Sequence, residues 1–244
     1  MTMKHDTSGL RQGIEVLDRK DTALLVPGGV SALTVAFSVV LALVAWVIWP
    51  YTGNTLGSEE IFIMLQTDLL VGLISLDVLM LFIGPASILM YIALYRTLKP
   101  ISPSLALLAL ALNIMGLGLM IVCRPLVELV NLSKQFSSAM DVVEQARLLA
   151  AGQVFLAQMD GIAWLAQTAL LMLAGLLNFT LMFRTAYYRR GTAWTGLICA
   201  AGGVGFWLPI IGQLFLLFNT LTTIPLCILI ALDLFRLKKT LIMR

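Results

Sequence analysis

The chain has 244 residues, of which 60% are hydrophobic and 12% are charged. A soluble globular domain carries about 25% charged residues, so this chain has half the charge that a water-facing surface requires. The composition therefore excludes a soluble enzyme, a nucleic-acid-binding protein and a disordered scaffold. It predicts an all-α, polytopic integral membrane protein in contact with the lipid bilayer. The net charge of +3 indicates membrane topology, and we expect no nucleic-acid partner.

The windows without charged residues predict a bundle of six transmembrane helices, since a helix needs roughly 20 apolar residues to cross the hydrocarbon core. The predicted spans cover approximately 29–49, 70–95, 102–124, 160–184, 192–215 and 219–237. The last two share one uncharged window, 191–232, and we expect the break between them at Asn219-Thr220. We also expect a kink in the second span at Gly84-Pro85, because proline removes a backbone hydrogen bond.

The distribution of basic residues predicts the orientation of the protein. If the N-terminus lies in the cytoplasm, 13 of the 16 basic residues fall in cytoplasmic segments. The three that remain outside are Arg124, Lys134 and Arg147. Because cytoplasmic loops are enriched in Lys and Arg, we predict a protein of the cell inner membrane with both termini in the cytoplasm. The transmembrane domain then covers 23–239, between a cytoplasmic N-terminal segment, 1–22, and a cytoplasmic tail, 240–244.

The N-terminal segment carries a helical pattern of its own. Leu10, Ile14 and Leu17 recur at helical spacing, with charged residues between them. This pattern is typical of a short amphipathic helix on the inner membrane surface. A frayed tail is the alternative.

The extracytoplasmic connection 125–159 is expected to contain an amphipathic outer helix between the third and fourth spans. Ser138 followed by Asp141 resembles a capping box, and apolar residues then repeat at helical spacing. These residues are Met140, Val143, Ala146, Ala150 and Val154. The helix either lies on the outer leaflet or projects from the membrane as an extension of the fourth span.

Polar side chains repeat along one face of the fourth span. Gln153, Asp160, Gln167 and Asn178 are separated by 7, 7 and 11 residues, and such positions fall within roughly 20° of one face of a helix. Lipid cannot satisfy the hydrogen bonds of these groups. The pattern indicates either hydrogen bonds between helices or a polar cavity that holds a solute.

Charged residues near the predicted outer ends of the spans complete the candidate site. A guanidinium is suited to carboxylate pairing, so we expect Arg124 to lie among three carboxylates. The mouth of the predicted site comprises Asp77, Arg124, Glu128 and Asp160, and its floor comprises Gln167 and Asn178. The alternative is a group of paired charges that only fixes the register of the helices.

Asp233, near the end of the sixth span, is a further ionisable residue. Arg236 and Lys239 follow it at three and six positions. We expect an ion pair at the inner interface and no role in the site.

The sequence offers no catalytic constellation. The single histidine, His5, lies in the N-terminal segment, and the three cysteines have no paired spacing, so zinc and haem sites are not predicted. We predict no catalytic residues, no metal and no cofactor, and we expect binding or transport of a small solute in a polar intramembrane cavity open to the outer face. A non-catalytic scaffold or accessory subunit is the first alternative. A lipid-modifying enzyme that uses Asp77 and Asp160 is the second.

Three stretches resemble an uncharacterised bacterial family of six-helix integral membrane proteins. The second span ends in 93–96 (ALYR), and the fourth contains 175–184 (GLLNFTLMFR) before a loop rich in Tyr and Arg. Asn219, with Pro225 nearby, opens the last span. The resemblance covers most of 23–239. It implies the six-helix fold and assigns no activity.

Overall fold

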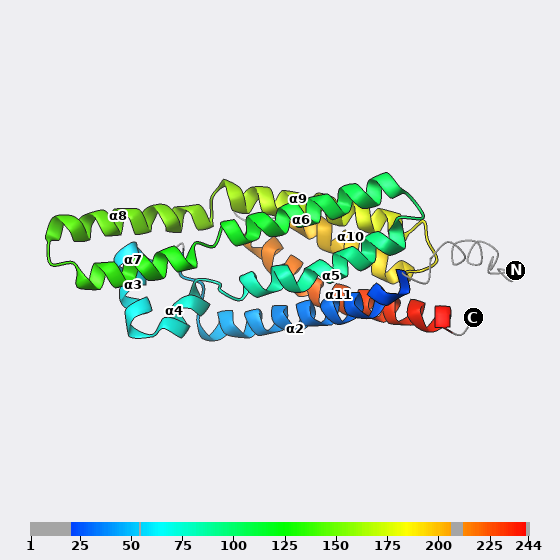
Figure 1. The fold of residues 1–244 in the computed structure, drawn as a ribbon, viewed down its shortest axis with the longest axis horizontal. Helices are drawn as coiled ribbons and strands as arrows, with labels where there is room; N and C mark the ends of the chain where they lie inside the picture. The colour runs from blue at the N-terminus through cyan, green and yellow to red at the C-terminus, as the bar shows by residue number, and fades with distance from the viewer. Residues whose placement is uncertain (1–20, 54, 206–211, 243–244) are drawn as a thin grey trace, which may run out of the picture. The chain divides into compact units, whose positions relative to one another are not determined.

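The computed structural model describes residues 21–53, 55–205 and 212–242, and every regular element in these ranges is a helix (Figure 1). The predicted all-α class is therefore confirmed for the described residues. In chain order the elements are η1 (Asp21–Leu24), α2 (Leu25–Ile48), α3 (Ser58–Thr67), α4 (Leu69–Ser75), α5 (Met80–Leu98), α6 (Pro103–Val122), α7 (Leu126–Ser138), α8 (Val142–Met159), α9 (Ile162–Met182), α10 (Arg190–Gly205) and α11 (Gly212–Ile242). The amphipathic helix predicted around Leu10 lies outside the described residues.

Five helical stretches of the described residues are long and apolar enough to cross a membrane. They are Thr22–Ile48, Met80–Leu98, Pro103–Ser138, Val142–Met182 and Leu214–Leu241. The surface exposes large apolar side chains such as Phe37, Val47 and Phe82, which a water-soluble protein would cover. The chain is thus an α-helical membrane protein. The predicted fifth span, 192–215, includes 206–211, which lie outside the described residues.

The chain divides into two compact units. Unit 1 comprises residues 1–39, 86–115 and 169–244, and unit 2 comprises 40–85 and 116–168. Helices α2, α5, α6 and α9 each contribute residues to both units. The described part of each unit is treated below by itself.

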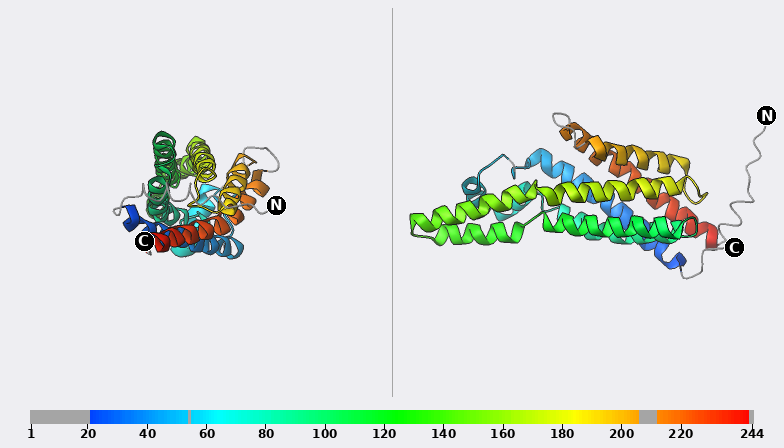
Figure 2. Two further views of the ribbon diagram at one scale, coloured as in Figure 1. Left: turned by 90° about the vertical axis from the view of Figure 1, so that its right-hand side faces the viewer. Right: turned by 90° about the horizontal axis from the view of Figure 1, so that it is seen from above.

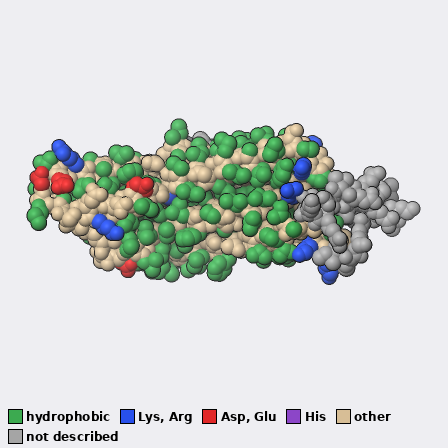
Figure 3. All heavy atoms as spheres, viewed as in Figure 1, with side chains coloured by type: hydrophobic (Ala, Val, Ile, Leu, Met, Phe, Trp, Pro, Cys, Tyr) green, Lys and Arg blue, Asp and Glu red, His purple; other side chains and the backbone are tan. Residues whose placement is uncertain are grey.

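Unit 1 contains the pair α10 and α11, which lie side by side in both views of Figure 2. Its apolar surface is interrupted by basic side chains that gather at one end of the unit (Figure 3). The described basic residues of unit 1 include Arg96, Lys99, Arg184, Arg190, Arg236 and Lys239. Because long basic side chains prefer the membrane surface to its core, this end has the character of a membrane interface.

A serine from α2 bonds to the backbone of α5 in unit 1. The Ser31 hydroxyl donates to the carbonyl of Ala86 and accepts a bond of 3.0 Å from the backbone amide of Met90. In an uninterrupted helix that amide would bond to the carbonyl four residues earlier, which is Ala86. Pro85, inside the same helix, lacks an amide proton. The polar joint therefore lies directly after the predicted Gly84-Pro85 kink.

The expected break at Asn219-Thr220 is wrong, because α11 continues through both residues. The side chain of Asn219 donates 2.7 Å to the carbonyl of Cys199 on α10, and the Thr220 hydroxyl donates 2.9 Å to the Leu216 carbonyl of its own helix. Both polar groups are thus satisfied without a turn. Pro225 likewise lies inside α11, so it does not mark the start of a span.

Asp233 forms the expected ion pair, but with Arg189 instead of Arg236 or Lys239. Its carboxylate accepts hydrogen bonds from the backbone amide of Arg189, at 3.1 Å, and the hydroxyl of Thr192, at 2.6 Å. The Arg189 side chain completes an ion pair at 3.2 Å. Since α10 begins at Arg190, this buried carboxylate binds the start of a helix, where backbone amides need acceptors.

Unit 2 contains a small bundle of α3, α4, α7 and α8, in which α3 contacts each of the other three helices. Its hydrophobic core consists of Ile61, Phe62, Leu65, Leu76, Leu126, Leu129, Leu156 and Met159. Gly152 lets α8 approach α3, because a Cβ at this position would lie 2.6 Å from the ring of Phe62. The small bundle is therefore a packed structure with its own core.

The connection 125–159 differs from its prediction in three respects. It holds two helices, α7 and α8, instead of one. Ser138 ends α7, and Asp141 is the residue that caps α8, where its carboxylate accepts from the amide of Val143. The predicted apolar face is exposed at Met140, Val143 and Val154, since α8 packs on the small bundle through the side that carries its core residues.

The segment between the first two predicted spans also contains structure that was not expected. Gly57 caps α3, and its amide is bonded to the Glu60 carboxylate at 2.8 Å. Asp68 then caps α4 by accepting from two backbone amides. The second predicted span, 70–95, is not continuous, because the chain turns between α4 and α5 at Asp77.

Candidate ligand-binding site

Four helix connections of unit 2 carry neighbouring polar groups. They are the α2–α3 loop with Tyr51 and Thr52, the α4–α5 turn with Asp77, the α6–α7 linker with Arg124, and the α8–α9 linker with Asp160. The charges of Asp160, Arg124 and Asp77 all act on Tyr51. The amide of Thr52 bonds to the Ser75 carbonyl at 3.1 Å, next to the α4–α5 turn. We call Tyr51, Thr52, Asp77, Arg124 and Asp160 the polar centre.

Asp77 has a backbone conformation that is unusual for a residue with a side chain. Its φ is +69°, and α4 ends there with bonds from Val78 to Leu73, at 3.0 Å, and from Asp77 to Ile74, at 2.9 Å. This pair of bonds is the Schellman pattern, in which glycine normally occupies the left-handed position. Asp77 is also 3% exposed. An aspartate therefore stands where glycine would adopt the backbone more easily, and the turn presents its carboxylate to the polar centre.

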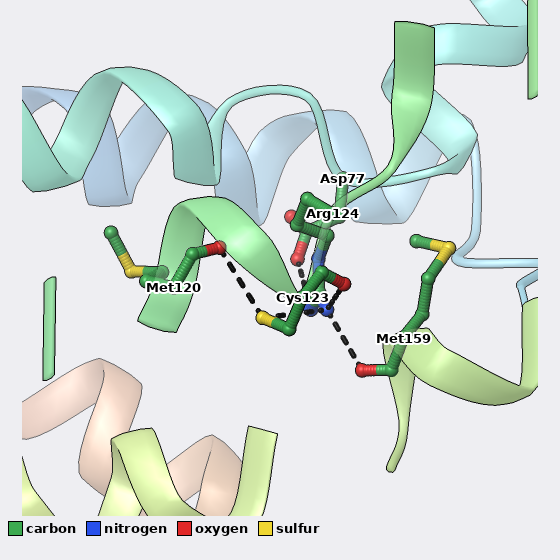
Figure 4. A network of polar contacts seen from close by, with 5 residues as sticks. All are labelled: Asp77, Met120, Cys123, Arg124 and Met159. Atoms are coloured by element: carbon green, nitrogen blue, oxygen red, sulfur yellow. Dashed lines mark hydrogen bonds and ion pairs between the residues drawn. The ribbon is translucent and has the colours of Figure 1, made fainter. Parts of the chain in front are cut away.

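Arg124 connects three of the helix breaks (Figure 4). Its guanidinium donates to Asp77 Oδ2 at 3.1 Å and to the carbonyl of Met159 at 3.0 Å. A longer contact of 3.3 Å reaches the Cys123 carbonyl. Met159 is the last residue of α8, so Arg124 satisfies a carbonyl at the negative end of that helix.

Aromatic side chains surround this ion pair. The guanidinium carbon of Arg124 lies 4.6 Å from the ring centroid of Trp164, a distance typical of a cation–π contact. A hydrogen bond from Trp46 and the charge of Arg124 both lower the pKa of Asp77, but burial outweighs them and raises it to about 6. Burial and then the charge of Asp160 raise the pKa of Tyr51. The Tyr51 hydroxyl is therefore protonated at neutral pH.

Four buried side-chain atoms of the polar centre lack a hydrogen bond of normal geometry among the described residues, although the Tyr51 hydroxyl lies near enough to the Asp160 carboxylate to act on it as a hydrogen-bond donor. They are the hydroxyl oxygens of Tyr51 and Thr52, Oδ1 of Asp77 and Nε of Arg124. Buried polar atoms are satisfied in the great majority of cases by protein or by ordered water. The centre can thus offer one acceptor, one donor and two hydroxyls that serve as either.

The structure brings together only part of the predicted site. Asp77 and Arg124 form the expected ion pair, and Asp160 lies within electrostatic range of both Tyr51 and Asp77. Glu128 is exposed on α7 and forms no ion pair with Arg124 among the described contacts. Gln167 is buried in the part of α9 that belongs to unit 2, whereas Asn178 is buried in unit 1.

The sequence pattern of the fourth span failed because the helix is not continuous. α8 ends at Met159 and α9 begins at Ile162, so the spacing across Asp160 does not define one face. Tyr51, Thr52 and Trp164 were not expected in the site. Spacing could not have revealed Trp164 either, because Asp160 lies outside α9 and the rule for residues four apart in one helix does not apply across the break.

Comparison of the chain with protein-family models, with curated proteins and with solved structures gives no match. The resemblance to a six-helix bacterial family stays a prediction, and the site has to be interpreted from its own chemistry.

Proposed function

We propose that the protein binds a small polar solute at the polar centre, as a receptor or as the first step of transport. The observation that carries this proposal is the presence of four unpartnered buried polar atoms beside one ion pair. An unsatisfied buried polar group costs about 1–3 kcal/mol. A ligand that forms hydrogen bonds with these atoms removes this cost. The ion pair alone does not remove it.

The proposal includes a topology. Six spans in the inner membrane, with both termini in the cytoplasm, agree with the 13 basic residues of unit 1 and the three of unit 2. α10, with 16 residues, would belong to the fifth span. The polar centre and the small bundle would then face the outer side.

Native mass spectrometry of the purified protein tests solute binding. The wild type is expected to retain a small molecule, and the double variant Tyr51→Phe/Thr52→Val is expected to lose it. This variant removes two unpartnered hydroxyls and leaves the Asp77–Arg124 ion pair in place. Its melting temperature should change little, because the Thr52 hydroxyl has no partner and the Tyr51 hydroxyl gives up only its interaction with Asp160.

Two matched variants serve as controls for that experiment. Tyr95→Phe and Thr34→Val remove the same chemical groups from unit 1, and the Thr34 hydroxyl bonds only within its own helix among the described contacts. Both should retain the small molecule. A wild-type protein that carries none would contradict the proposed function.

Cysteine labelling tests the topology, because all three native cysteines are buried. Met140, between α7 and α8, is 99% exposed. Met140→Cys should react with a membrane-impermeant maleimide on spheroplasts, and Lys238→Cys should react only after lysis. The opposite pattern would overturn the orientation.

A second candidate function is that of an accessory subunit that engages a partner through α8. The exposed positions Val143 and Val154 lie on the side of α8 that faces away from the small bundle. Replacing both by Gln should remove a copurifying protein without changing the melting temperature. An unchanged set of copurifying proteins would eliminate this candidate.

A further inference from the structure

Unit 2 has an excess of negative charge that the net charge of the whole protein conceals. It contains eight of the 13 acidic residues and three of the 16 basic ones. The acidic residues are Glu59, Glu60, Asp68, Asp77, Glu128, Asp141, Glu144 and Asp160. A surface with one predominant sign attracts ligands of the opposite sign.

The polar centre carries the same imbalance at close range. Arg124 is its one cation, and the guanidinium is engaged by Asp77 Oδ2 and two backbone carbonyls. Asp160 has no ion pair of its own among the described residues. One positive and two negative side chains leave the centre with a net charge of −1.

The unpartnered atoms of the centre are mainly oxygens. Oδ1 of Asp77 and the hydroxyl oxygens of Tyr51 and Thr52 are buried and can each accept a hydrogen bond. Asp77 itself is 3% exposed, and the strained turn holds its carboxylate in place. The carboxylate of Asp160 supplies further acceptors at the exposed edge of the centre.

We propose that the solute bound at the polar centre is a small amine, held through its primary ammonium group by Asp77, Asp160 and Tyr51. This inference rests on the proposed function and specifies its ligand class. A primary ammonium has three donors and one positive charge, so it satisfies three oxygens and neutralises the centre. An anion would face two carboxylates, and a neutral amide would leave the net negative charge of the centre in place.

Gly53 provides a second means of disturbing the site. A Cβ at this buried glycine would lie 2.5 Å from the Tyr51 hydroxyl oxygen and 2.8 Å from its Cζ. Gly53→Ala must therefore displace the tyrosine ring while keeping every polar group of the centre. Weaker amine binding in this variant would show that the position of the hydroxyl matters as well as its presence.

The test compares three two-carbon probes that differ in charge: ethylammonium, acetamide and acetate. Each is added at the same concentration and ionic strength to the detergent-purified full chain, and thermal unfolding is followed by tryptophan fluorescence. Ethylammonium is expected to raise the melting temperature of the wild type by about 2–4 °C, and the other probes are expected to leave it unchanged.

Asp160→Asn should abolish the ethylammonium shift. Its matched control is Glu128→Gln, which removes the same charge from unit 2 at an exposed position outside the centre, and which should retain the shift. If both variants lose the ethylammonium shift equally, the shift reflects general electrostatic attraction to unit 2, and the proposal is overturned.

The outcomes separate the amine proposal from the proposed function. If native mass spectrometry shows a retained molecule but acetamide or acetate stabilises the protein instead of ethylammonium, solute binding stands and the amine proposal fails. If no probe shifts the melting temperature, the amine proposal also fails. If the wild type retains no molecule and no probe binds, the proposed function fails with it.

Discussion

Each unit buries an aspartate that is paired with an arginine, yet the two carboxylates differ in the contacts of their oxygens. In unit 1, Oδ2 of Asp233 accepts two hydrogen bonds, and Oδ1 has no hydrogen bond but lies 3.2 Å from Arg189 Nε. In unit 2, Oδ2 of Asp77 is bonded to Arg124, and Oδ1 has no hydrogen-bond partner. Both carboxylates thus leave one oxygen without a hydrogen bond, but that oxygen of Asp233 still faces a cation, whereas Oδ1 of Asp77 can accept from another molecule.

Backbone strain also differs between the aspartates of the two units. Asp77 has the one positive φ at a non-glycine residue among the described positions, whereas Asp233 lies in the regular helix α11. Strained residues persist where the surrounding structure holds them, and they concentrate at functional sites. The comparison therefore singles out unit 2, although unit 1 contains more of the basic charge.

The largest effect is expected from Arg124→Met, which breaks the ion pair of unit 2. Asp77 would remain buried without its cation, and such losses cost about 3–5 kcal/mol. Urea unfolding in detergent micelles, followed by tryptophan fluorescence, measures this cost. Adding Asp77→Asn should recover part of it, because the uncompensated charge is then gone. A double variant as unstable as the single one would show that the carbonyl contacts of Arg124 dominate.

A smaller loss, of about 2–3 kcal/mol, is expected from Asp233→Ala in unit 1. The variant removes the acceptor for the Arg189 amide and the Thr192 hydroxyl, and bonds to charged groups are worth about 1.5–3 kcal/mol. Arg189 does not become a buried charge, since 47% of its side chain is exposed. The same unfolding measurement applies. A loss larger than that of Arg124→Met would reverse the contrast between the two ion pairs.

The smallest effects concern two glycines of unit 2 and should differ in sign. Gly152→Ala forces a Cβ to within 2.6 Å of Phe62 and 3.0 Å of Ser58, so overpacking should destabilise the small bundle by about 1–3 kcal/mol. Gly118→Ala meets no atom within 4 Å and should stabilise α6 by about 0.5–1 kcal/mol. Equal effects in both variants would show that the small bundle is not closely packed at α8.

The helical class and most apolar windows were predictable, because each segment meets lipid through its own side chains. The breaks between helices were not predictable, since their positions depend on residues that are distant in the sequence. Asn219 resembles a turn residue in the sequence, but its side-chain amide donates a hydrogen bond to α10. Asp77 was expected inside a span, whereas it forms a left-handed turn and pairs with Arg124, 47 residues later. The Asp77–Arg124 pairing itself followed from complementary charge at similar depth.

Tyr51 and Thr52 escaped prediction for a related reason. A tyrosine beyond the end of a span is typical of interfacial anchoring, and nothing in the local sequence distinguishes an anchoring ring from one that lies in a polar site. Its role depends on Gly53, which makes room for the ring, and on the α4–α5 turn, more than 20 residues further along the chain.

The serine joint between α2 and α5 has a consequence for the order in which the protein is made. Before α2 is in contact, the Ala86 carbonyl and the Met90 amide can bond to each other, because they are four residues apart in one helix. A newly inserted α5 therefore exposes no open backbone group to lipid at this point. When the helices meet, the Ser31 hydroxyl bonds to both of these groups. The contact between α2 and α5 therefore does not require α5 to enter the membrane with an open backbone group.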